Sequence, residues 1–406
     1  MDVAPRPRHH LVGLVLLASL LTFPTQAASD EPVQITQEDG FTPLFDGKTT
    51  DGWYNPYEWG KVTVEEGELR LTANRKFFLV TRERFGDFVF EGEVKVPDGP
   101  ANSGFMLRAI VGPNQVIGYQ AEVDPSERRW SGGLYDEGRR AWLHPLKDQA
   151  QAQAAFDRTT WNHYRIECVG DHIKIYVNGV LTTDYRDPLD QYGPLAVQHH
   201  GEKGQTYRFR NLKVKRLGRH GWTPIFDGRS LEGWTIQPGG SWRVEDGVIV
   251  GENNAEEPRH GLLVWNQPVE DFTLRLKFRA VRGNSGVYFR SRLVENDPVA
   301  IHGLQAEIDS SRDVGGLYET GGRGWVVQPP EELVAKHLKT GDAWNELAIS
   351  AHGERIVTHL NGQLIIDHRD ESAPRRGVLA LQLHGGQTMR VEFKDLEMLT
   401  PVEHAR

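Results

Sequence analysis

One short pattern occurs twice in this chain and constrains its fold more than any other feature. The sequence Gln-Ala-Glu-Val-Asp at residues 120–124 returns as Gln-Ala-Glu-Ile-Asp at residues 305–309. Because side chains alternate between the two faces of an extended strand, the polar residues share one face and the apolar residues share the other. Carboxylates and amides are costly to remove from water without partners or a task. We therefore treat this polar face as a candidate functional surface, which would carry Gln120, Glu122, Asp124, Gln305, Glu307 and Asp309.

The doubled pattern lies inside a repeat that spans most of the chain. Phe-Asp-Gly before Gly-Trp occurs at 45–53 and 226–234, Asn-Ser-Gly at 102–104 and 284–286, and Gly-Gly-Leu-Tyr at 132–135 and 315–318. A period of roughly 180 residues predicts two tandem domains rather than a short-repeat solenoid, and the length of 406 residues agrees. We assign residues 1–28 to a signal peptide, 29–217 to a first repeat and 222–400 to a second repeat.

The local patterns within each repeat are typical of strands. Residues 272–278 and 172–177 alternate apolar and polar side chains, and Asn178-Gly179 is a strong hairpin turn. Glu-Gly at 66–67 and Asp-Gly at 246–247 indicate two more hairpins. Short helices are expected only at 148–156 and 330–337. The sequence thus predicts an all-β chain of two tandem β-sandwiches or jelly rolls.

The N-terminus indicates the cellular compartment, and the net charge limits the classes of partner. Arg6 and Arg8 precede an apolar run at 11–23 and a small-residue stretch, which is typical of a secretory signal peptide. The run is too short for a membrane-spanning helix, so a periplasmic or secreted protein without a membrane span is expected. A formal charge of −9 without a basic run argues against a nucleic-acid partner. The single cysteine, Cys168, excludes an intrachain disulfide and is interpreted as a buried structural thiol.

Further polar residues are expected on the same face as the doubled strand. Strand alternation places Arg108 beside Met106 and, in the second repeat, Arg290 beside Tyr288. His199 stands in an apolar slot and is interpreted as structural. The remaining candidates come from the Asn-Ser-Gly motif and from the last strand of each repeat: Asn102, Asn284, Gln198, His200, Gln382 and His384.

A repeated loop supplies aromatic and basic residues for the rim of the site. Residues 132–142 and 315–325 carry Tyr135, Arg140, Trp142, Tyr318, Arg323 and Trp325. Aromatic rings beside arginines and carboxylates suit sugars, whose C–H faces stack while their hydroxyls take paired hydrogen bonds. An oligosaccharide or glycoside is the expected ligand.

Structural interpretations compete with these functional ones. Trp53, Trp161, Trp234 and Trp344 are expected to pack in the core or at sheet edges. The two arginines could form ion pairs with Glu122 and Glu307, and the polar strand could be structural throughout. The number of polar strands that converge favours function, since buried polar networks are either functional or fully satisfied.

The ordered set of motifs resembles the 3-keto-disaccharide hydrolase domain family. The set comprises Phe-Asp-Gly with Gly-Trp, Asn-Ser-Gly with an arginine four residues on, Gln-x-Glu-x-Asp, Gly-Gly-Leu-Tyr, Trp-Asn, Asn-Gly and Leu-x-x-Gln-x-His, once per repeat. The resemblance implies a concanavalin-A-like jelly roll with a carbohydrate on its concave face. It further implies cleavage of glycosides whose C3 hydroxyl has been oxidised to a ketone, and an upstream sugar 3-dehydrogenase that supplies them.

The chemistry of such a substrate suggests roles for the candidate residues. A C3 ketone acidifies the C2 proton, so a carboxylate can abstract it and the enolate can expel the C1 substituent, after which water adds. In this hypothesis Glu122 and Glu307 are the bases, and Arg108 and Arg290, or a bound divalent cation, stabilise the enolate. His200 and His384, or Asp124 and Asp309, assist the leaving group.

Two other functions remain open at the level of sequence. The Glu and Asp of the doubled strand lie roughly 6.6 Å apart at Cα, which a retaining glycoside hydrolase could use. A non-catalytic sugar-binding protein would need the same polar face, and tandem copies would raise its avidity. No closely spaced Cys/His pattern indicates a cofactor. If a divalent cation binds, the candidate ligands are Glu122, Asp124 and His200. Both repeats keep the candidate residues, so both are expected to function.

Overall fold

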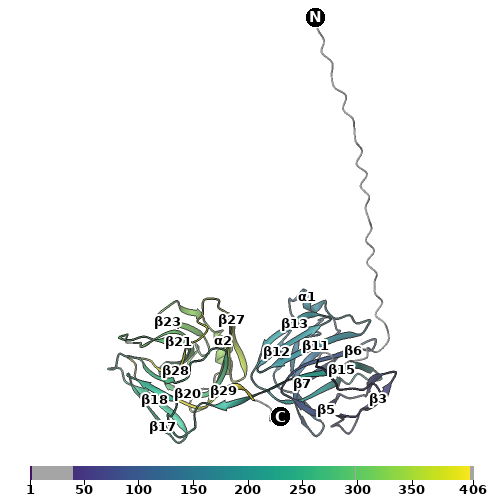
Figure 1. The fold of residues 1–406 in the computed structure, drawn as a ribbon, viewed down its shortest axis with the longest axis horizontal. Coiled ribbons are helices and arrows are strands. Elements are labelled where there is room, and N and C mark those ends of the chain that lie inside the picture. The colour runs from purple at the N-terminus through teal and green to yellow at the C-terminus, as the bar shows by residue number, and fades with distance from the viewer. Residues whose placement is uncertain (2–39, 298, 403–406) are drawn as a thin grey trace. The chain divides into compact units, whose positions relative to one another are not determined.

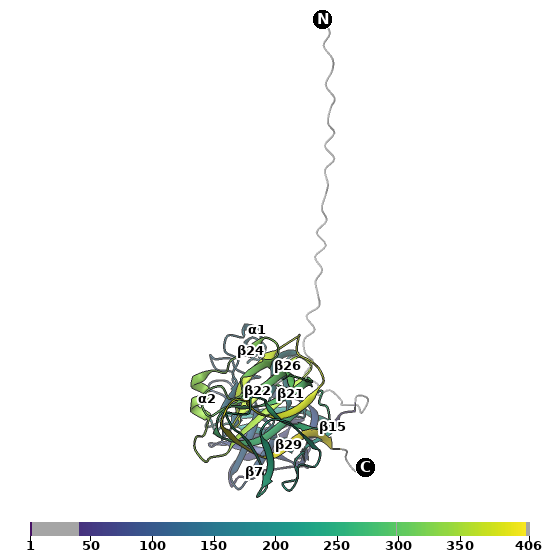
Figure 2. The same cartoon turned by 90° about the vertical axis from the view of Figure 1, so that its left-hand side faces the viewer.

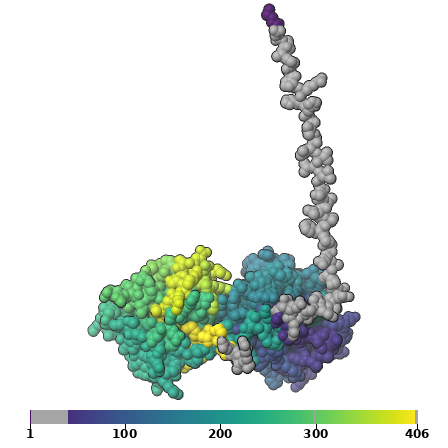
Figure 3. Space-filling model, in the orientation of Figure 1, coloured from purple at the N-terminus to yellow at the C-terminus, as the bar shows by residue number. Residues whose placement is uncertain are grey.

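Each copy of the repeat forms a β-sandwich. The computed structural model describes Met1, residues 40–297 and residues 299–402, and the predicted signal peptide at 1–28 lies, beyond Met1, outside them. Figure 1 shows the strands of the first repeat in purple to teal and those of the second in green to yellow, and Figure 3 shows the same colours on the surface. The prediction of an all-β chain with two tandem concanavalin-A-like jelly rolls is confirmed.

The first repeat contains fifteen named strands among the described residues, and they are β1 (Thr42–Pro43), β2 (Trp53–Tyr54), β3 (Lys61–Glu65), β4 (Glu68–Thr72), β5 (Phe77–Phe85), β6 (Asp87–Lys95), β7 (Ser103–Gly112), β8 (Gln115–Val123), β9 (Leu134–Glu137), β10 (Ala141–His144), β11 (Asn162–Val169), β12 (His172–Val177), β13 (Val180–Arg186), β14 (Gly193–His199) and β15 (Thr206–Pro224).

The second repeat follows the same order, with β16 (Trp234–Gln237), β17 (Ser241–Glu245), β18 (Val248–Asn253), β19 (Gly261–Trp265), β20 (Phe272–Arg282), β21 (Ser285–Leu293), β22 (Ile301–Ile308), β23 (Leu317–Thr320), β24 (Gly324–Val327), β25 (Asn345–His352), β26 (Arg355–Leu360), β27 (Gln363–Arg369), β28 (Val378–Leu383) and β29 (Met389–Val402). Both predicted helical segments contain a helix, namely α1 (Ala150–Gln153) and α2 (Glu331–His337), and α2 lies at the edge of the second repeat in Figure 2.

One sheet of each sandwich carries the doubled polar strand. Its strand order is β10-β9-β8-β7-β14-β5-β2 in the first repeat and β24-β23-β22-β21-β28-β19-β16 in the second. The two orders correspond strand for strand, with β8 equivalent to β22. The facing sheets of the two sandwiches are continuous with each other, because β15 pairs with β29 and places Trp222 opposite Leu399.

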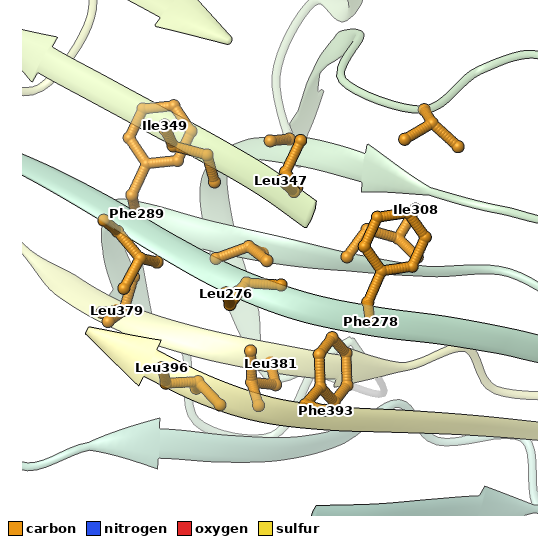
Figure 4. Packing of buried hydrophobic residues seen from close by; sticks show 14 of the residues in the cluster. Leu276, Phe278, Phe289, Ile308, Leu347, Ile349, Leu379, Leu381, Phe393 and Leu396 are labelled. Atoms are coloured by element: carbon orange, nitrogen blue, oxygen red, sulfur yellow. The ribbon is translucent and has the colours of Figure 1, made fainter. Parts of the chain in front are cut away.

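The core lies between the two sheets of each sandwich, on the apolar side of the polar strand. In the second repeat, Ile308 and Leu381 of the site-bearing sheet meet Leu276, Phe278 and Leu347 of the facing sheet (Figure 4). All five side chains are fully buried. Burial of such a side chain contributes about 1.5–3 kcal/mol each, so the core fixes which face of β22 turns outward.

The turn and tryptophan motifs shape the scaffold as predicted. The hairpins at Glu66-Gly67, Asn178-Gly179 and Asp246-Gly247 place both turn residues at positive φ, which glycine tolerates best. The indoles of Trp53 and Trp234 are buried and donate to the carbonyls of Leu44 (2.6 Å) and Ile225 (2.9 Å). These motifs therefore stabilise the fold.

Two further predictions concern single features. Cys168 is buried in the first core, and burial raises the pKa of its thiol to about 12, so it stays a protonated, unreactive thiol. Within the described part of the chain, the helices are all too short to span a bilayer.

Candidate active site

A buried glutamate that accepts two amide hydrogen bonds lies at the centre of the polar face of the first repeat. Asn102 donates from Nδ2 to Oε1 of Glu122 (2.6 Å), and Gln120 donates from Nε2 to Oε2 (2.7 Å). The residue opposite Glu122 across the β7–β8 pair is Gly104. A Cβ atom there would lie 2.5 Å from the Gln120 side chain, so the Asn-Ser-Gly motif needs its glycine for close packing.

The second repeat builds the same arrangement from equivalent residues. Asn284 donates from Nδ2 to Oε1 of Glu307, and Gln305 donates from Nε2 to Oε2 (3.0 Å). Gly286 again leaves room for the glutamine, because a Cβ atom would lie 2.5 Å from Oε1 of Gln305. We call these two triplets of asparagine, glutamine and glutamate the amide–carboxyl centres.

Burial changes the acidity of both glutamates. It raises the pKa of Glu122 to about 7, although the hydrogen bonds from Asn102 and Gln120 act in the opposite direction. Burial likewise raises the pKa of Glu307 to about 8, against the hydrogen bond from Asn284. A carboxyl that titrates near neutrality can both accept and release a proton, which is the property of a general acid–base catalyst.

A hollow opens beside the centre of the second repeat. Its volume is about 530 Å³, which is large enough for a sugar unit. Trp325 is 37% exposed at its rim and meets Tyr318 edge to face, with ring centroids 5.5 Å apart. The lining residues are His260, Asn284, Val299, Gln305, Glu307, Tyr318, Thr320, Gly321, Trp325, Gln382, His384 and Gln387.

Charged pairs surround the centre of the first repeat. Lys76 forms an ion pair with Glu137, and both contribute to the electrostatic environment of Tyr135 together with Glu122. Nδ1 of His200 lies 2.7 Å from Oε1 of Glu202, and this hydrogen bond raises the pKa of His200.

The same carboxylate connects His200 to the centre. The hydroxyl of Tyr207 donates to Oε2 of Glu202 (2.7 Å) and accepts the backbone N–H of Asn102 (3.0 Å). A chain of hydrogen bonds thus runs from His200 through Glu202 and Tyr207 to Asn102, the partner of Glu122. The network therefore connects His200 to the backbone of the residue whose side chain holds Glu122.

The second repeat has uncharged residues at the matching positions. His260 is equivalent to Lys76, because each immediately precedes the strand that pairs with the last strand of the site-bearing sheet in its repeat. Thr320 is equivalent to Glu137, because they pair with Gly303 and Gly118, which occupy the same position in β22 and β8. The corresponding strand positions also place Tyr288 where the first repeat has Met106. The two faces therefore share a centre and differ in their rims.

Tyr288 completes a hydrogen-bond network that the first repeat lacks. Its hydroxyl accepts Nε2–H of Gln382 (2.9 Å) and lies 2.8 Å from Oγ1 of Thr320. Burial raises the pKa of the Tyr288 phenol, so it stays protonated. In the first repeat, the amide atoms of the buried Gln198 have no hydrogen-bond partner among the described residues, because Met106 offers none.

The structure does not bring the two candidate arginines to the centres. A bulge with positive φ at Arg108 and Arg290 interrupts the expected alternation in β7 and β21. Arg108 donates to the carbonyls of Gly86 (2.8 Å) and Gly170 (2.6 Å), and Arg290 donates to those of Glu270 (2.6 Å) and Gly353 (2.8 Å). Their ion-pair partners are Asp87 and Asp271, so the alternative that they form ion pairs with Glu122 and Glu307 is wrong.

The candidate aspartates serve the loops after the polar strands. Asp124 accepts the backbone N–H of Ser126 (3.2 Å) and pairs with Arg128 (2.9 Å). Asp309 accepts the N–H of Ser311 (3.0 Å) and its hydroxyl (2.6 Å). Both carboxylates are therefore committed to turns rather than to the hollow.

The loop residues divide between rim and scaffold. Tyr135 pairs with Gln120 across β8 and β9 and meets Trp142 edge to face at 5.2 Å, as the sequence predicts for a rim. Arg140 is instead held by Asp136 (2.6 Å) and Asp187 (2.8 Å). Its counterpart Arg323 pairs with Glu319 and Asp370.

His199 has the structural role that its apolar slot suggests. It is buried, stacks on Phe77 with centroids 5.8 Å apart and accepts the N–H of Gly201 at Nδ1 (3.0 Å).

The sequence did not single out several residues that surround the centres. Lys76, His260 and Glu202 lie just outside strand ends, and Tyr207 occupies a strand position without a repeated partner. The two repeats carry different residues at each of these positions, so a comparison of the repeats that looks for identical residues does not find them. For Lys76 and His260, the difference between the residues that precede β5 and β19 is a signal that could have found them.

The donor set does not favour a metal centre. In the ranges that the structure describes, no group of three or more histidine, cysteine, aspartate and glutamate side chains is arranged to hold a metal ion. The candidates Glu122, Asp124 and His200 each have the hydrogen-bond partners given above.

Comparison with protein families gives one match that covers most of the chain. The family described as "3-keto-alpha-glucoside-1,2-lyase-like domain" matches residues 40–215 and again residues 221–399. A comparison with curated proteins gave no match.

Solved structures resemble one repeat at a time. A protein titled a candidate glycosyl hydrolase from Parabacteroides distasonis is 18% identical, with a TM-score of 0.35, over 45% of this chain and 98% of its own. The carbohydrate-binding module CBM66 from Bacillus subtilis is 20% identical, with a TM-score of 0.30, over 40% of this chain and 95% of its own. A Bacillus subtilis protein of unknown function with a galectin-like fold is 11% identical, with a TM-score of 0.36, over 43% of this chain and 92% of its own.

Proposed function

The chain belongs to the 3-keto-alpha-glucoside-1,2-lyase-like domain family and is thus a carbohydrate-active protein, and we propose that it cleaves 3-keto-glycosides, 3-keto-disaccharides among them, by elimination and hydration. The observation that supports this proposal most is Glu307, a buried carboxyl beside a hollow of about 530 Å³ with a pKa of about 8. A base of this strength suits abstraction of a proton that an adjacent ketone has acidified.

The proposed elimination uses two protein groups. Glu307 takes the proton from C2, and the electron pair of the C2–H bond forms an enolate with the C3 ketone. The enolate then collapses, so that a C1=C2 double bond forms and the C1–O bond breaks. His384, in its protonated form, gives a proton from Nε2 to the leaving oxygen. Asn284 and Gln305 hold the carboxyl of Glu307 in position throughout.

Hydration returns Glu307 and His384 to their starting protonation states. Water adds its oxygen to C1 while the neutral His384 takes one of its protons, and Glu307 returns a proton to C2. The products are a 3-keto sugar and the free aglycone or second sugar. In the first repeat, Glu122 and His200 occupy the equivalent positions, with Asn102, Gln120 and Gln198 beside them.

The rim residues are proposed to bind the sugar. Trp325 and Tyr318 offer aromatic surfaces at the hollow, and Trp142 and Tyr135 do so in the first repeat. We further propose that a sugar 3-dehydrogenase supplies the ketone, because the substrate must first be oxidised at C3. The signal peptide expected at 1–28 would place the reaction in the periplasm or outside the cell.

Product analysis by NMR tests the proposal. The mature protein and a Glu122→Gln/Glu307→Gln double variant are incubated with 3-keto-trehalose and with trehalose. Release of 3-ketoglucose from the keto substrate alone, abolished in the variant, is the expected result. Cleavage of trehalose would indicate an ordinary glycoside hydrolase, and saturation-transfer signals without product would indicate a sugar-binding protein. Either result would contradict the proposed reaction.

A further inference from the structure

Two imidazoles of the second repeat are fixed by a single glycine. Nδ1 of His384 lies 2.7 Å from the carbonyl oxygen of Gly385, and the N–H of Gly385 donates to Nδ1 of His260 (3.3 Å). The two ring centroids are 4.6 Å apart. A Cβ atom at Gly385 would lie 2.1 Å from the carbonyl oxygen of Pro258, so this close approach requires glycine.

These contacts assign opposite tautomers to the two rings. His260 accepts a hydrogen bond at Nδ1, so a neutral His260 carries its proton on Nε2. His384 donates from Nδ1 to a carbonyl, so a neutral His384 has a free electron pair on Nε2. Burial, with a smaller contribution from His384, lowers the pKa of His260 to about 4, and His260 is therefore neutral at pH 7.

Both Nε2 atoms are available to a ligand. His260 and His384 line the same hollow as Glu307. The hydrogen bonds of the described residues engage each ring only at Nδ1. His260 thus presents an uncharged N–H donor to the hollow, and His384 presents a group that can transfer a proton.

We propose that His260 donates Nε2–H to the C3 ketone oxygen of the substrate in the second repeat and stabilises the enolate formed there. The inference rests on the proposed elimination and names the group that recognises the oxidised carbon. His260 keeps its proton throughout, because it acts as a hydrogen-bond donor and not as an acid. A fixed donor aimed at a developing oxyanion is among the largest sources of rate acceleration in enzymes, and a neutral imidazole can fill that role.

The need for such a donor follows from the placement of the other candidates. The hydrogen bonds and ion pair of Arg290 hold its guanidinium at Glu270, Asp271 and Gly353. Tyr288 is occupied by Gln382 and Thr320. Among the residues that line the hollow, His260 has both a proton to donate and a tautomer fixed by the backbone.

The first repeat provides an internal comparison. Lys76 stands at the position of His260, and its ammonium is paired with Glu137. The ketone-binding role is thus assigned to the second repeat alone.

The test compares two substitutions of His260 in a Glu122→Gln background, so that turnover reports on the second repeat. His260→Gln keeps a side-chain N–H donor, whereas His260→Phe removes it and fills a similar volume. With 3-keto-trehalose, His260→Phe is expected to lower kcat by about 100-fold with a much smaller change in KM. His260→Gln is expected to retain at least about a tenth of kcat. Thermal unfolding of each variant serves as the control for folding.

A spectroscopic readout separates donation from a structural role. A substrate labelled with ¹³C at C3 is bound to a Glu122→Gln/Glu307→Gln protein, which lacks both bases. The ketone resonance is expected to move downfield on binding, to keep that shift with His260→Gln added and to lose it with His260→Phe added.

The outcomes of the two proposals are distinguishable. Unchanged turnover and an unchanged ketone shift in His260→Phe would overturn the role of His260 while the elimination stands. Absence of turnover by the wild-type protein would overturn the elimination itself. If His260→Phe does not fold, His260→Gln and His260→Glu decide the question, because the glutamate cannot donate when ionised and should lose the ¹³C shift.

Discussion

The two repeats hold the same amide–carboxyl centre in different electrostatic surroundings. Around Glu122 the structure places two charged pairs, Lys76 with Glu137 and His200 with Glu202. Beside Glu307 it places a hollow of about 530 Å³ that is lined by the imidazoles of His260 and His384 and by amide, hydroxyl and aromatic side chains. Duplication has thus preserved the group that can move a proton and changed the groups that meet the ligand.

The difference indicates that the residues for chemistry and those for ligand binding lie in different parts of each sheet. The centre depends on two residues of β8 or β22 and on the asparagine just before the paired strand β7 or β21, and it is the same in both repeats. The rim depends on residues at strand ends and turns, where substitutions disturb the core little. We therefore expect the second repeat to carry most of the turnover, in contrast to the expectation from sequence that both copies contribute.

The largest expected effect comes from removing one base at a time. Glu307→Gln should lower turnover of 3-keto-trehalose by at least about 100-fold, because general-base catalysis contributes about that much. Glu122→Gln should change it less than about twofold, since the second repeat remains intact. Steady-state kinetics of both variants measures this directly. Equal losses of turnover in the two variants would contradict this prediction and show that both repeats contribute equally.

A smaller effect is expected in the pH dependence. The fraction of ionised carboxylate rises with pH while that of the protonated histidine falls, so kcat/KM should pass through a maximum, and one of its two limbs should report the pKa of the working glutamate. The midpoint of that limb should lie at about 8 when Glu122→Gln leaves the second repeat, and at about 7 when Glu307→Gln leaves the first. Profiles between pH 5 and 10 test this prediction. Identical midpoints would mean that a single repeat, or another group, sets the profile.

The rim of the second repeat can be transferred to the first. In a Glu307→Gln background, Lys76→His with Met106→Tyr and Glu137→Thr removes the ion pair and supplies the residues found in the second repeat. We expect residual turnover to rise about five- to tenfold, or about 1–1.4 kcal/mol of transition-state stabilisation. The matched control is Lys76→Ala with Glu137→Ala, which opens the rim without the new groups. No gain over that control would contradict the importance of the exchanged residues.

The smallest effect is expected at the aromatic rim. Trp325→Ala should raise KM about fivefold, because loss of one exposed aromatic contact costs about 1 kcal/mol. Trp142→Ala should change KM less, since Trp142 packs against Trp130 with centroids 4.8 Å apart and is only partly free for a ligand. Steady-state kinetics with 3-keto-trehalose measures KM for both variants. A larger loss with Trp142→Ala would place the main binding surface in the first repeat.

The fold could be predicted from the sequence because its determinants are local and doubled. Alternation in the polar strand placed Ala306 and Ile308 in the core, and the turn at Asn178-Gly179 fixed a hairpin. The repeated motifs predicted that Asn102, Gln120 and Glu122 share one polar face, and the structure places them in one hydrogen-bonded centre in each copy.

The arginines could not be placed by the same reasoning. Alternation assumes a regular strand, and the bulge at Arg108 and Arg290 turns each side chain toward buried carbonyls instead. The rim was missed for a different reason. His260 and Lys76 occupy equivalent positions but differ in chemistry, so a search for repeated residues misses them. The pairing of β5 with β14 and of β19 with β28 shows that they correspond.

The most direct test of elimination at Glu307 is the isotopic content of the product. Glu122→Gln protein is given 3-keto-trehalose in D₂O, and the 3-ketoglucose from the first turnovers is examined by NMR, with product alone in D₂O as the control for spontaneous exchange. Because the proton on Glu307 can exchange with solvent before hydration, deuterium at C2 of the product is expected, together with a primary kinetic isotope effect when the substrate carries deuterium at C2. Product without deuterium at C2, combined with the absence of any such isotope effect, would contradict the elimination and the role of Glu307 as its base.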